Sequence, residues 1–405
     1  MSTVRYLQRW SWAAAVILLV ACNKDKTIEA PAKLVPFQPT LRVQRIWDAS
    51  VDDKKAVALR LGLGLAIDNG RVYAAGHKGD VAALDLNNGR TLWRTRLKAP
   101  LAGGTAASAD LVLIGSSDGR LFALNAADGT PRWEVRVNGE VLSPPAISAR
   151  VIALRTGDGK LRGLSPVDGH ELWSQEQQVP RLSLRGTARP LIVGDFVLCG
   201  FDNGKVVAVN ANDGSVAWEA TVTPPHGRTE LERLVGIDSA VLIQGQNVYA
   251  VGFQGRVAML ALDTGQIWWS HELSSYRGMS LDDELLYVST AEGEVVALRA
   301  RTGAEVWRQS ALLHRGLSAP ANMDDAIVVA DAQGYVHFLD KASGAMAARV
   351  SAGSTRISNA PVVAGNVVLV INDRGQINAY RVQPLAAPAG NKKAAPETPP
   401  PTENK

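Results

Sequence analysis

A glycine followed fourteen residues later by a tryptophan recurs six times along the chain. A second glycine lies ten residues after the first in every copy, and a seventh copy keeps both glycines but has Ala348 at the tryptophan position. Successive first glycines are 38 to 51 residues apart. A period of about 40–50 residues with several short strands per unit is typical of a propeller or solenoid. The six complete pairs are Gly79/Trp93, Gly119/Trp133, Gly159/Trp173, Gly204/Trp218, Gly255/Trp269 and Gly293/Trp307.

The two ends of the chain share one repeat. An eighth copy begins at Gly375 and lacks its second half, whereas Trp47 opens a segment, Trp-Asp-Ala-Ser-Val, that resembles Trp-Glu-Val-Arg-Val at Trp133. The N-terminal strand is therefore expected to complete the last repeat beside the strand around Ile377. Such closure removes the exposed edges of an open array. The sequence predicts an all-β fold, an eight-bladed β-propeller with four-stranded antiparallel blades.

Hydrophobicity within each repeat indicates which strands are buried. Continuous apolar runs flank the first glycine, as in residues 112–114 (Val-Leu-Ile) and 121–124 (Leu-Phe-Ala-Leu). Such runs between turn residues suit strands covered on both faces. The tryptophan strand alternates instead, as in residues 133–137 (Trp-Glu-Val-Arg-Val), and is expected to be the outermost, half-solvated strand. The glycine four residues before each tryptophan is expected where a large ring lies against the backbone.

The N-terminus predicts export and lipidation. Residues 1–21 combine Arg5 and Arg9 with a twelve-residue apolar run, which is too short to span a bilayer and is typical of a signal peptide. Its end, Leu-Val-Ala followed by Cys22, resembles the bacterial lipobox, which implies that Cys22 carries the lipid anchor. Asn23 after the cysteine implies sorting to the outer membrane, on its periplasmic face. The alternative is an ordinary secretory signal with an incidental cysteine.

The remaining domain boundaries follow from composition. We expect a lipidated tether over residues 22–40, the propeller over 41–383, and a disordered tail rich in proline and alanine over 384–405. The formal net charge is +4, and removal of Arg5 and Arg9 with the leader leaves +2. A nearly neutral body offers no electrostatic footprint for nucleic acid.

The polar residues predict neither a metal site nor a catalytic site. Cys199 lies in an apolar strand run, where a lone cysteine is usually a small core side chain. Acidic groups such as residues 282–284 precede buried strands and are expected to be solvated turns, without the alternating ligands of a calcium loop. The histidines show no metal-ligand spacing and are each expected on the surface or in a turn: His77, His170, His226, His271, His314 and His337.

The repeat itself, Ala-Leu-Asp followed by Thr-Gly and Trp, resembles the tryptophan-docking repeat of quinoprotein dehydrogenases. That resemblance implies an eight-bladed ring that binds pyrroloquinoline quinone and calcium on its axis, and makes a periplasmic dehydrogenase the alternative function. Those enzymes are usually much longer, and many stack the quinone on a disulfide between adjacent cysteines. The chain has two cysteines, Cys22 and Cys199, and they are not adjacent. Function has to be inferred from the site, since the repeat is shared architecture.

Three segments between the repeats resemble the BamB family of lipoproteins from the outer-membrane β-barrel assembly machinery. They are residues 182–186 (Leu-Ser-Leu-Arg-Gly), 229–234 (Thr-Glu-Leu-Glu-Arg-Leu) and 312–315 (Leu-Leu-His-Arg). This resemblance covers nearly the whole chain. It implies a scaffold that is not an enzyme and holds no cofactor, and that docks on the periplasmic domains of BamA to assist the folding and insertion of β-barrel proteins. The expected partners include other subunits of the machinery and unfolded outer-membrane proteins.

The same resemblance implies which residues bind the partner. The Leu-Ser-Leu-Arg loop of the family matches Leu182, Leu184 and Arg185. A second, acidic loop often has two aspartates one residue apart; here Gly236 replaces the first, and Asp238 remains. Two leucines two residues apart project to one side of an extended segment. The alternative for these leucines is that they fill a gap between two blades.

Overall fold

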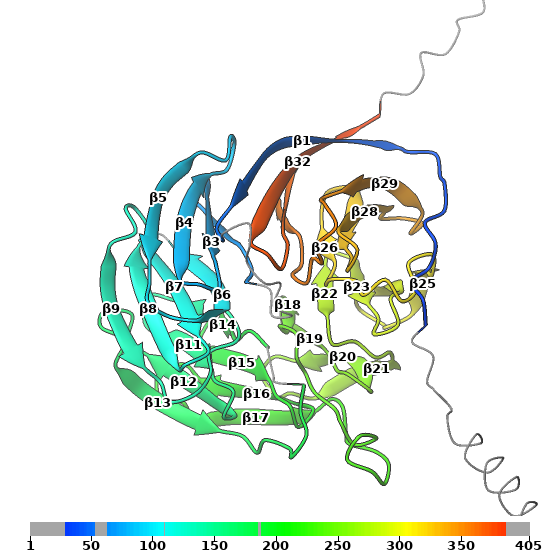
Figure 1. The fold of residues 1–405 in the computed structure, drawn as a ribbon. Helices are drawn as coiled ribbons and strands as arrows, with labels where there is room; N and C mark the ends of the chain where they lie inside the picture. Colours follow the sequence, from blue (N-terminus) through cyan, green and yellow to red (C-terminus); the bar gives the residue numbers. More distant parts are fainter. Residues whose placement is uncertain (1–28, 53–62, 109, 185–187, 386–405) are drawn as a thin grey trace, which may run out of the picture.

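Eight four-stranded antiparallel sheets surround a central axis in a computed structural model of the chain (Figure 1). The structure describes residues 29–52, 63–108, 110–184 and 188–385, and no helix is present among them. In seven blades the four strands follow one another in chain order from the axis outwards. The predicted eight-bladed propeller is confirmed.

The first four blades come from residues 66–221, and their third strands are almost fully buried. Blade 1 contains β2 (Ala66–Asp68), β3 (Arg71–Ala75), β4 (Asp80–Asp85) and β5 (Thr91–Arg96); blade 2 contains β6 (Leu101–Ser108), β7 (Leu111–Ser116), β8 (Arg120–Asn125) and β9 (Pro131–Arg136); blade 3 contains β10 (Ala146–Ile147), β11 (Ile152–Arg155), β12 (Lys160–Leu164) and β13 (Glu171–Glu176); blade 4 contains β14 (Leu191–Val193), β15 (Phe196–Gly200), β16 (Lys205–Asn210) and β17 (Val216–Thr221).

The remaining blades include the one that joins the two ends of the chain. Blade 5 contains β18 (Leu242–Gln244), β19 (Asn247–Val251), β20 (Arg256–Ala261) and β21 (Ile267–Glu272); blade 6 contains β22 (Gly278–Leu281), β23 (Leu285–Ser289), β24 (Val295–Arg299) and β25 (Glu305–Gln309); blade 7 contains β26 (Ala321–Asn322), β27 (Ala326–Ala330), β28 (Tyr335–Asp340) and β29 (Met346–Ser351); blade 8 contains β30 (Val362–Ala364), β31 (Val367–Ile371), β32 (Gln376–Pro384) and, as its outermost strand, β1 (Leu41–Ser50).

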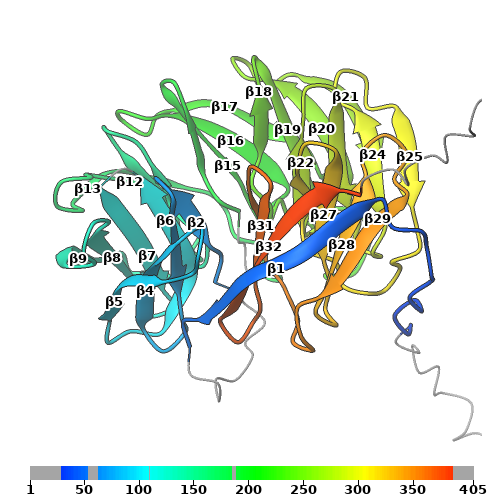
Figure 2. The ribbon, with the colours of Figure 1, turned by 90° about the horizontal axis from the view of Figure 1, so that it is seen from above.

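The N-terminal strand closes the ring as the sequence predicts. β1 runs antiparallel along β32, with Trp47 opposite Ala379 and Ala49 opposite Ile377, and Figure 2 shows the two strands side by side along the edge of blade 8. Because this pairing joins residues more than 300 positions apart, it is among the longest-range contacts of the fold.

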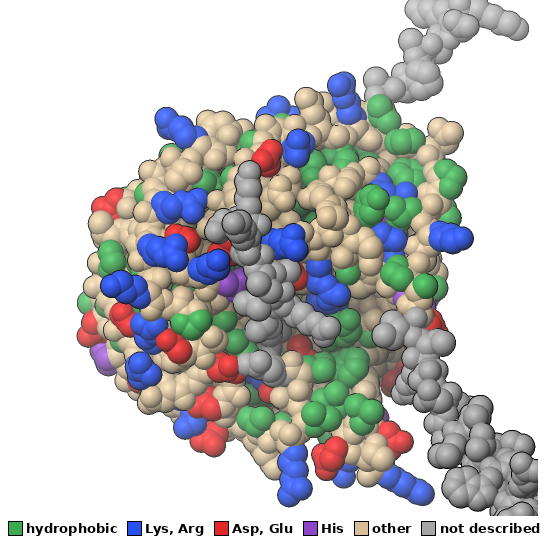
Figure 3. Space-filling model, in the orientation of Figure 1, with side chains coloured by type: hydrophobic (Ala, Val, Ile, Leu, Met, Phe, Trp, Pro, Cys, Tyr) green, Lys and Arg blue, Asp and Glu red, His purple; other side chains and the backbone are tan. Residues whose placement is uncertain are grey.

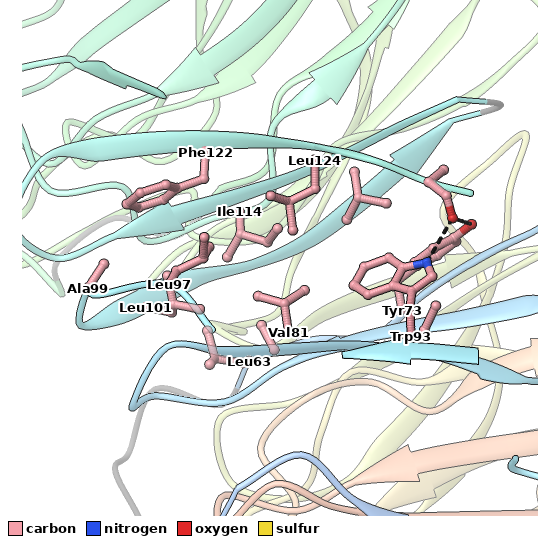
Figure 4. Close-up of a cluster of buried hydrophobic side chains, with 14 residues drawn as sticks. Leu63, Tyr73, Val81, Trp93, Leu97, Ala99, Leu101, Ile114, Phe122 and Leu124 are labelled. Atoms are coloured by element: carbon pink, nitrogen blue, oxygen red, sulfur yellow. Dashed lines mark hydrogen bonds between the residues drawn. The ribbon is translucent and has the colours of Figure 1, made fainter. Parts of the chain in front are cut away.

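Each tryptophan of the repeat docks on the following blade. Figure 4 shows the arrangement between blades 1 and 2, where Trp93 packs in a buried cluster with Tyr73 and Leu124. The indole N–H groups donate to backbone carbonyls of the next blade at 2.7–3.3 Å: Trp47 to Leu86, Trp93 to Ala126, Trp133 to Pro166, Trp173 to Ala211, Trp218 to Leu262, Trp269 to Ala300 and Trp307 to Lys341.

The second glycine of each repeat receives a ring from the blade before it. At Gly214, for example, φ is +73°, and a Cβ atom would lie 2.7 Å from Cε3 of Trp173. The glycine is required both by its left-handed backbone conformation and by the ring above it. The expectation of a close approach is met, and the ring belongs to the preceding blade.

The missing tryptophan at Ala348 has a structural reason. A tryptophan there would dock on the turn between the third and fourth strands of blade 8. These strands are β32 and β1, which come from opposite ends of the chain, so no such turn exists. Residues 29–40, here called the strap, approach blade 7 instead: Thr40 N–H donates to Ala347 at 2.9 Å, and Arg349 lies 5.0 Å from the ring centre of Phe37.

Candidate partner-binding surface

The two leucines singled out in the sequence lie on the surface of the link between β13 and β14. Leu182 is 42% exposed and Leu184 is 39% exposed, and Arg185 lies outside the described residues. The link contains Pro180 and Pro190, and a proline cannot donate a backbone hydrogen bond to a strand. The two leucines therefore present part of their apolar surface to solvent.

Asp238 lies in the next link, between β17 and β18, and is nearly buried with 6% of its surface exposed. Burial raises the pKa of Asp238 to about 7; repulsion from Asp202 adds to this, and attraction to Arg155 opposes it. Asp202 and Arg155 form a buried ion pair at 2.9 Å. The predicted acidic residue is therefore part of an interior charge cluster with two carboxylates and one guanidinium.

The structure brings Leu184 and Asp238 to the same place. Both line a cavity of about 700 Å³, here called the axial cavity, to which all eight blades contribute residues near the start of their innermost strands. Gly236 leaves room for Asp238, since a Cβ atom at Gly236 would lie 2.8 Å from a carboxylate oxygen of Asp238. The cavity thus connects the leucine link with the link that contains Asp238.

The face of the ring drawn in Figure 3 carries no dominant charge. In the view of Figure 3, basic and acidic side chains are interspersed over the face of the ring, with hydrophobic side chains in smaller groups between them. This agrees with the nearly neutral composition. Isolated apolar side chains are normal on a protein surface, so the leucine link is singled out by its sequence and its position beside the axial cavity.

The described residues contain no group of three or more histidine, cysteine or acidic side chains arranged to hold a metal ion. Cys199 is completely buried in β15, and this burial raises the pKa of its thiol to about 12. It therefore packs in the core as expected. None of the described residues forms a helix long and apolar enough to cross a bilayer.

One histidine contradicts the sequence analysis. His337, expected on the surface or in a turn, is fully buried in β28. Its Nε2 lies 3.0 Å from an oxygen of Asp331, and its Nδ1 lies 3.4 Å from Nε of Arg349. Because an arginine Nε–H donates, Nδ1 accepts and Nε2–H donates to the aspartate. Burial lowers the pKa of His337, which favours this neutral form.

The cluster around His337 also holds the strap. Arg315 donates to Asp331 at 2.7 Å and to the carbonyl of Ala32 at 2.9 Å, and Arg349 donates to the carbonyl of Val35. His314 lies 2.6 Å from Glu29. In Figure 1 the strap passes β25 and β29 before it enters β1. The stretch that contains His314 and Arg315 is recognisable in the sequence, but its contact with the strap is not, because Ala32 and Arg315 are 283 residues apart along the chain.

Comparisons with known proteins identify relatives of the whole chain. A family model described as the outer membrane protein assembly factor BamB matches residues 44–103, 77–309 and 291–393. The BamB of Pseudomonas aeruginosa is 46% identical over 379 residues, which cover 93% of this chain and 100% of the relative. The crystal structure of BamB from Moraxella catarrhalis superimposes with a TM-score of 0.77 at 26% identity, covering 84% of this chain and 100% of that chain.

Quinoprotein enzymes share the fold at much lower identity. The quinohemoprotein alcohol dehydrogenase of Comamonas testosteroni superimposes with a TM-score of 0.66 at 12% identity, covering 89% of this chain and 78% of that chain. At this identity the likeness extends to the architecture alone, which many functions share.

Proposed function

Because the chain belongs to the BamB family of outer membrane protein assembly factors, we propose that it is a non-enzymatic scaffold of the β-barrel assembly machinery that docks on BamA. In this role it assists the folding and insertion of β-barrel proteins and acts beside other subunits of the machinery, with unfolded outer-membrane proteins as further partners. The relatives are named as assembly factors and not as enzymes, which disfavours the dehydrogenase alternative.

The exposure of Leu182 and Leu184 carries the docking proposal. Two leucines that are each about two-fifths exposed leave apolar area in water, and covering that area on a partner is favourable. Arg185 follows them directly in the sequence, and arginine is enriched among the residues that dominate binding energy at interfaces. We assign these three residues to the contact with the periplasmic domains of BamA.

Asp238 is proposed to act indirectly, unlike the exposed leucines. Since it is 6% exposed and lies beside Asp202 and Arg155, a direct contact with a partner would involve a small part of its surface. We propose that Asp238 contributes to partner binding chiefly by holding the link between β17 and β18 in its position at the axial cavity.

The docking proposal is tested with a triple variant, Leu182→Ala, Leu184→Ala and Arg185→Glu. We expect its binding to BamA to fall at least about thirtyfold, because interface hot spots each contribute about 2 kcal/mol or more. Co-purification with BamA from detergent-solubilised membranes and a titration with purified periplasmic domains measure the change. Retained affinity would contradict the assignment.

A matched control separates docking from folding. Leu92 and Leu172 are 38% and 45% exposed on β5 and β13, so the double variant Leu92→Ala and Leu172→Ala removes a similar apolar area elsewhere. It should bind BamA like the wild type. A thermal melt of each variant checks the ring, and a collapsed melt of the triple variant would assign the loop to the core.

We further propose that Cys22 is lipidated and anchors the mature chain to the periplasmic face of the outer membrane. Cys22 lies outside the described residues, and the proposal rests on the lipobox-like sequence. Cys22→Ser should leave the precursor uncleaved or release the protein from the outer membrane, since two or more acyl chains are needed for stable anchoring. Mass spectrometry of the wild-type N-terminus checks this, and an unmodified terminus at another residue would overturn it.

A further inference from the structure

Three arginines line the axial cavity, from the links that lead into blades 4, 6 and 8. They are Arg189, Arg277 and Arg356. None of them forms an ion pair with a described residue, whereas the buried arginines Arg155 and Arg315 each pair with a carboxylate. Among the described residues that line the cavity, Asp238 is the single carboxylate, so the lining carries an excess of positive charge.

Further hydrogen-bond donors in the cavity lack a partner among the described residues. The hydroxyl of Ser239, in a side chain that is 8% exposed, has none, and the same holds for Nδ2 of Asn359 and Nε of Arg277. Buried polar groups in folded proteins are nearly always hydrogen-bonded. Amide and guanidinium nitrogens can donate but not accept. A ligand that satisfies these donors must therefore supply acceptor atoms such as oxygens.

The nearby carboxylate of Asp373 does not form an ion pair with the arginines of the cavity. It lies close enough to Arg277 and Arg356 to feel their charge. Its two oxygens, however, accept hydrogen bonds from the Ser358 hydroxyl at 2.8 Å and from the Ser358 N–H at 3.2 Å. Because no ion pair joins Asp373 or another described carboxylate to these arginines, and Nε of Arg277 has no partner among the described residues, the guanidinium groups keep donors available for an acceptor that enters the cavity.

The size and lining of the cavity favour a polypeptide over a small ion. Its volume of about 700 Å³ lies within the range of sites that hold drug-sized ligands. Leu142, Met279 and Pro320 add apolar lining between the arginines, and Leu184 places the exposed leucine link at the same cavity. A ligand that fits combines carboxylates with apolar side chains over several residues.

We propose that the axial cavity binds an acidic polypeptide segment, whose carboxylates pair with Arg189, Arg277 and Arg356. This site deepens the proposed function and rests on it, since the segment would come from a protein docked at the leucine link. Bidentate pairing of arginine with carboxylate supplies strength and directionality. The same chemistry in a free small carboxylate is the other source to be distinguished.

The experiment uses the purified mature protein and defined probes. An acetylated and amidated peptide, Asp-Leu-Asp-Leu-Asp, is titrated by calorimetry beside its Asn-Leu-Asn-Leu-Asn counterpart and beside citrate. We expect the aspartate peptide to bind, the asparagine peptide not to bind, and the affinity to fall as salt is added. In the double variant Arg277→Gln and Arg356→Gln, the affinity should fall at least about tenfold, as expected for the loss of hydrogen bonds between charged groups.

The control is Arg90→Gln, which removes an exposed arginine from a turn of blade 1 and should leave the affinity unchanged. A thermal melt confirms that each variant is folded. Equal binding by the wild type and the double variant, or no binding of the aspartate peptide, would overturn the proposal. Binding of citrate without the peptide would also overturn it and assign the cavity to a small carboxylate.

This test is separate from the test of the proposed function. The peptide titration needs no BamA, and the leucine variants leave the three arginines in place. Loss of BamA binding in the leucine variants together with failed peptide binding would retain the scaffold function and reject the cavity as a site. Peptide binding together with intact BamA binding in the leucine variants would reject the docking loop instead.

Discussion

At the scale of single residues, three charged side chains buried between the blades form one cluster. Arg155 and Asp202 are 2% and 4% exposed in their side chains and pair at 2.9 Å. Asp238 adds a second carboxylate beside them. Burial disfavours the charged form of a carboxyl group, and together with repulsion from Asp202 it raises the pKa of Asp238.

The pH dependence of stability should follow from Asp238. Its pKa rises from 3.8 in the unfolded chain to about 7 in the folded protein, so the folded state retains a proton that the unfolded state has already lost. Stability should therefore fall between about pH 4 and pH 7, by roughly 3–5 kcal/mol for this group. Asp238→Asn should be close to neutral at pH 4 and stabilising at pH 8, as measured by urea unfolding at both pH values.

Asp202→Asn is the contrasting variant. It leaves Arg155 without its ion-pair partner and should cost about 3–5 kcal/mol. If Asp238→Asn changed stability equally at pH 4 and pH 8, the raised pKa would be wrong. If Asp202→Asn were as harmless as Asp238→Asn, the assignment of the ion pair would be wrong.

A pair of glycines in blade 5 tests the docking of tryptophan. Gly245 and Gly265 have φ values of +59° and +69°, but a Cβ atom at Gly265 would lie 2.4 Å from Cε3 of Trp218, whereas one at Gly245 would meet nothing within 4 Å. Gly245→Ala should cost about 1–2 kcal/mol for the left-handed backbone. Gly265→Ala should cost about 1–3 kcal/mol more, because it also overpacks against the ring.

Chemical denaturation of both variants measures the difference. In a Trp218→Ala background the extra cost at Gly265 should disappear, since the ring it meets is gone. Equal costs for the two glycines in the wild-type background would contradict the docking.

At the scale of elements, the outermost strand of each blade has two functions. It pairs with its own sheet and places a tryptophan on the next sheet. β1 does both for blade 8, because it pairs with β32 and donates from Trp47 to Leu86 of blade 1 at 2.9 Å. β29 lacks the second function at Ala348, and the strap contacts it there through Thr40 and Phe37.

The closing strand can be tested through its tryptophan. Trp47 is 8% exposed, and truncating a buried tryptophan costs roughly 3–5 kcal/mol. Trp47→Ala should therefore destabilise the ring about as much as Trp133→Ala. Urea unfolding checks this, with Trp268→Ala as the control because Trp268 on β21 is 58% exposed. Wild-type stability in Trp47→Ala, or in a chain lacking residues 41–50, would mean that β1 does not stabilise the closed ring.

At the scale of the whole molecule, the ring arranges links from distant parts of the sequence around one axis. The innermost strands of all blades start near the axial cavity, so each link between blades contributes a few residues to it. A surface of this kind can be changed one link at a time while the blades keep their packing. Loops on a rigid scaffold are where binding residues are commonly found.

The amino-acid sequence by itself determined the architecture. The number of Gly/Trp repeats predicted the number of blades, and the half-repeats at Trp47 and Gly375 predicted that the two ends of the chain close the ring. The continuous and alternating runs of apolar residues predicted which strands are buried. These features can be predicted from the sequence because strand burial and repeat length depend on the residues within each unit of about 40 residues.

Only the tertiary structure shows which residues of the links between blades lie close together. It buried His337 against Asp331, placed Asp238 beside Arg155, and brought Arg189, Arg277 and Arg356 to one cavity. The Leu-Ser-Leu loop was found in the sequence through its resemblance, but its exposure was not. Links that are far apart in the sequence, such as those with Gly64 and Asn359, meet because the ring is closed. The sequence around each of these residues does not predict such contacts, because they form between blades and not within a repeat.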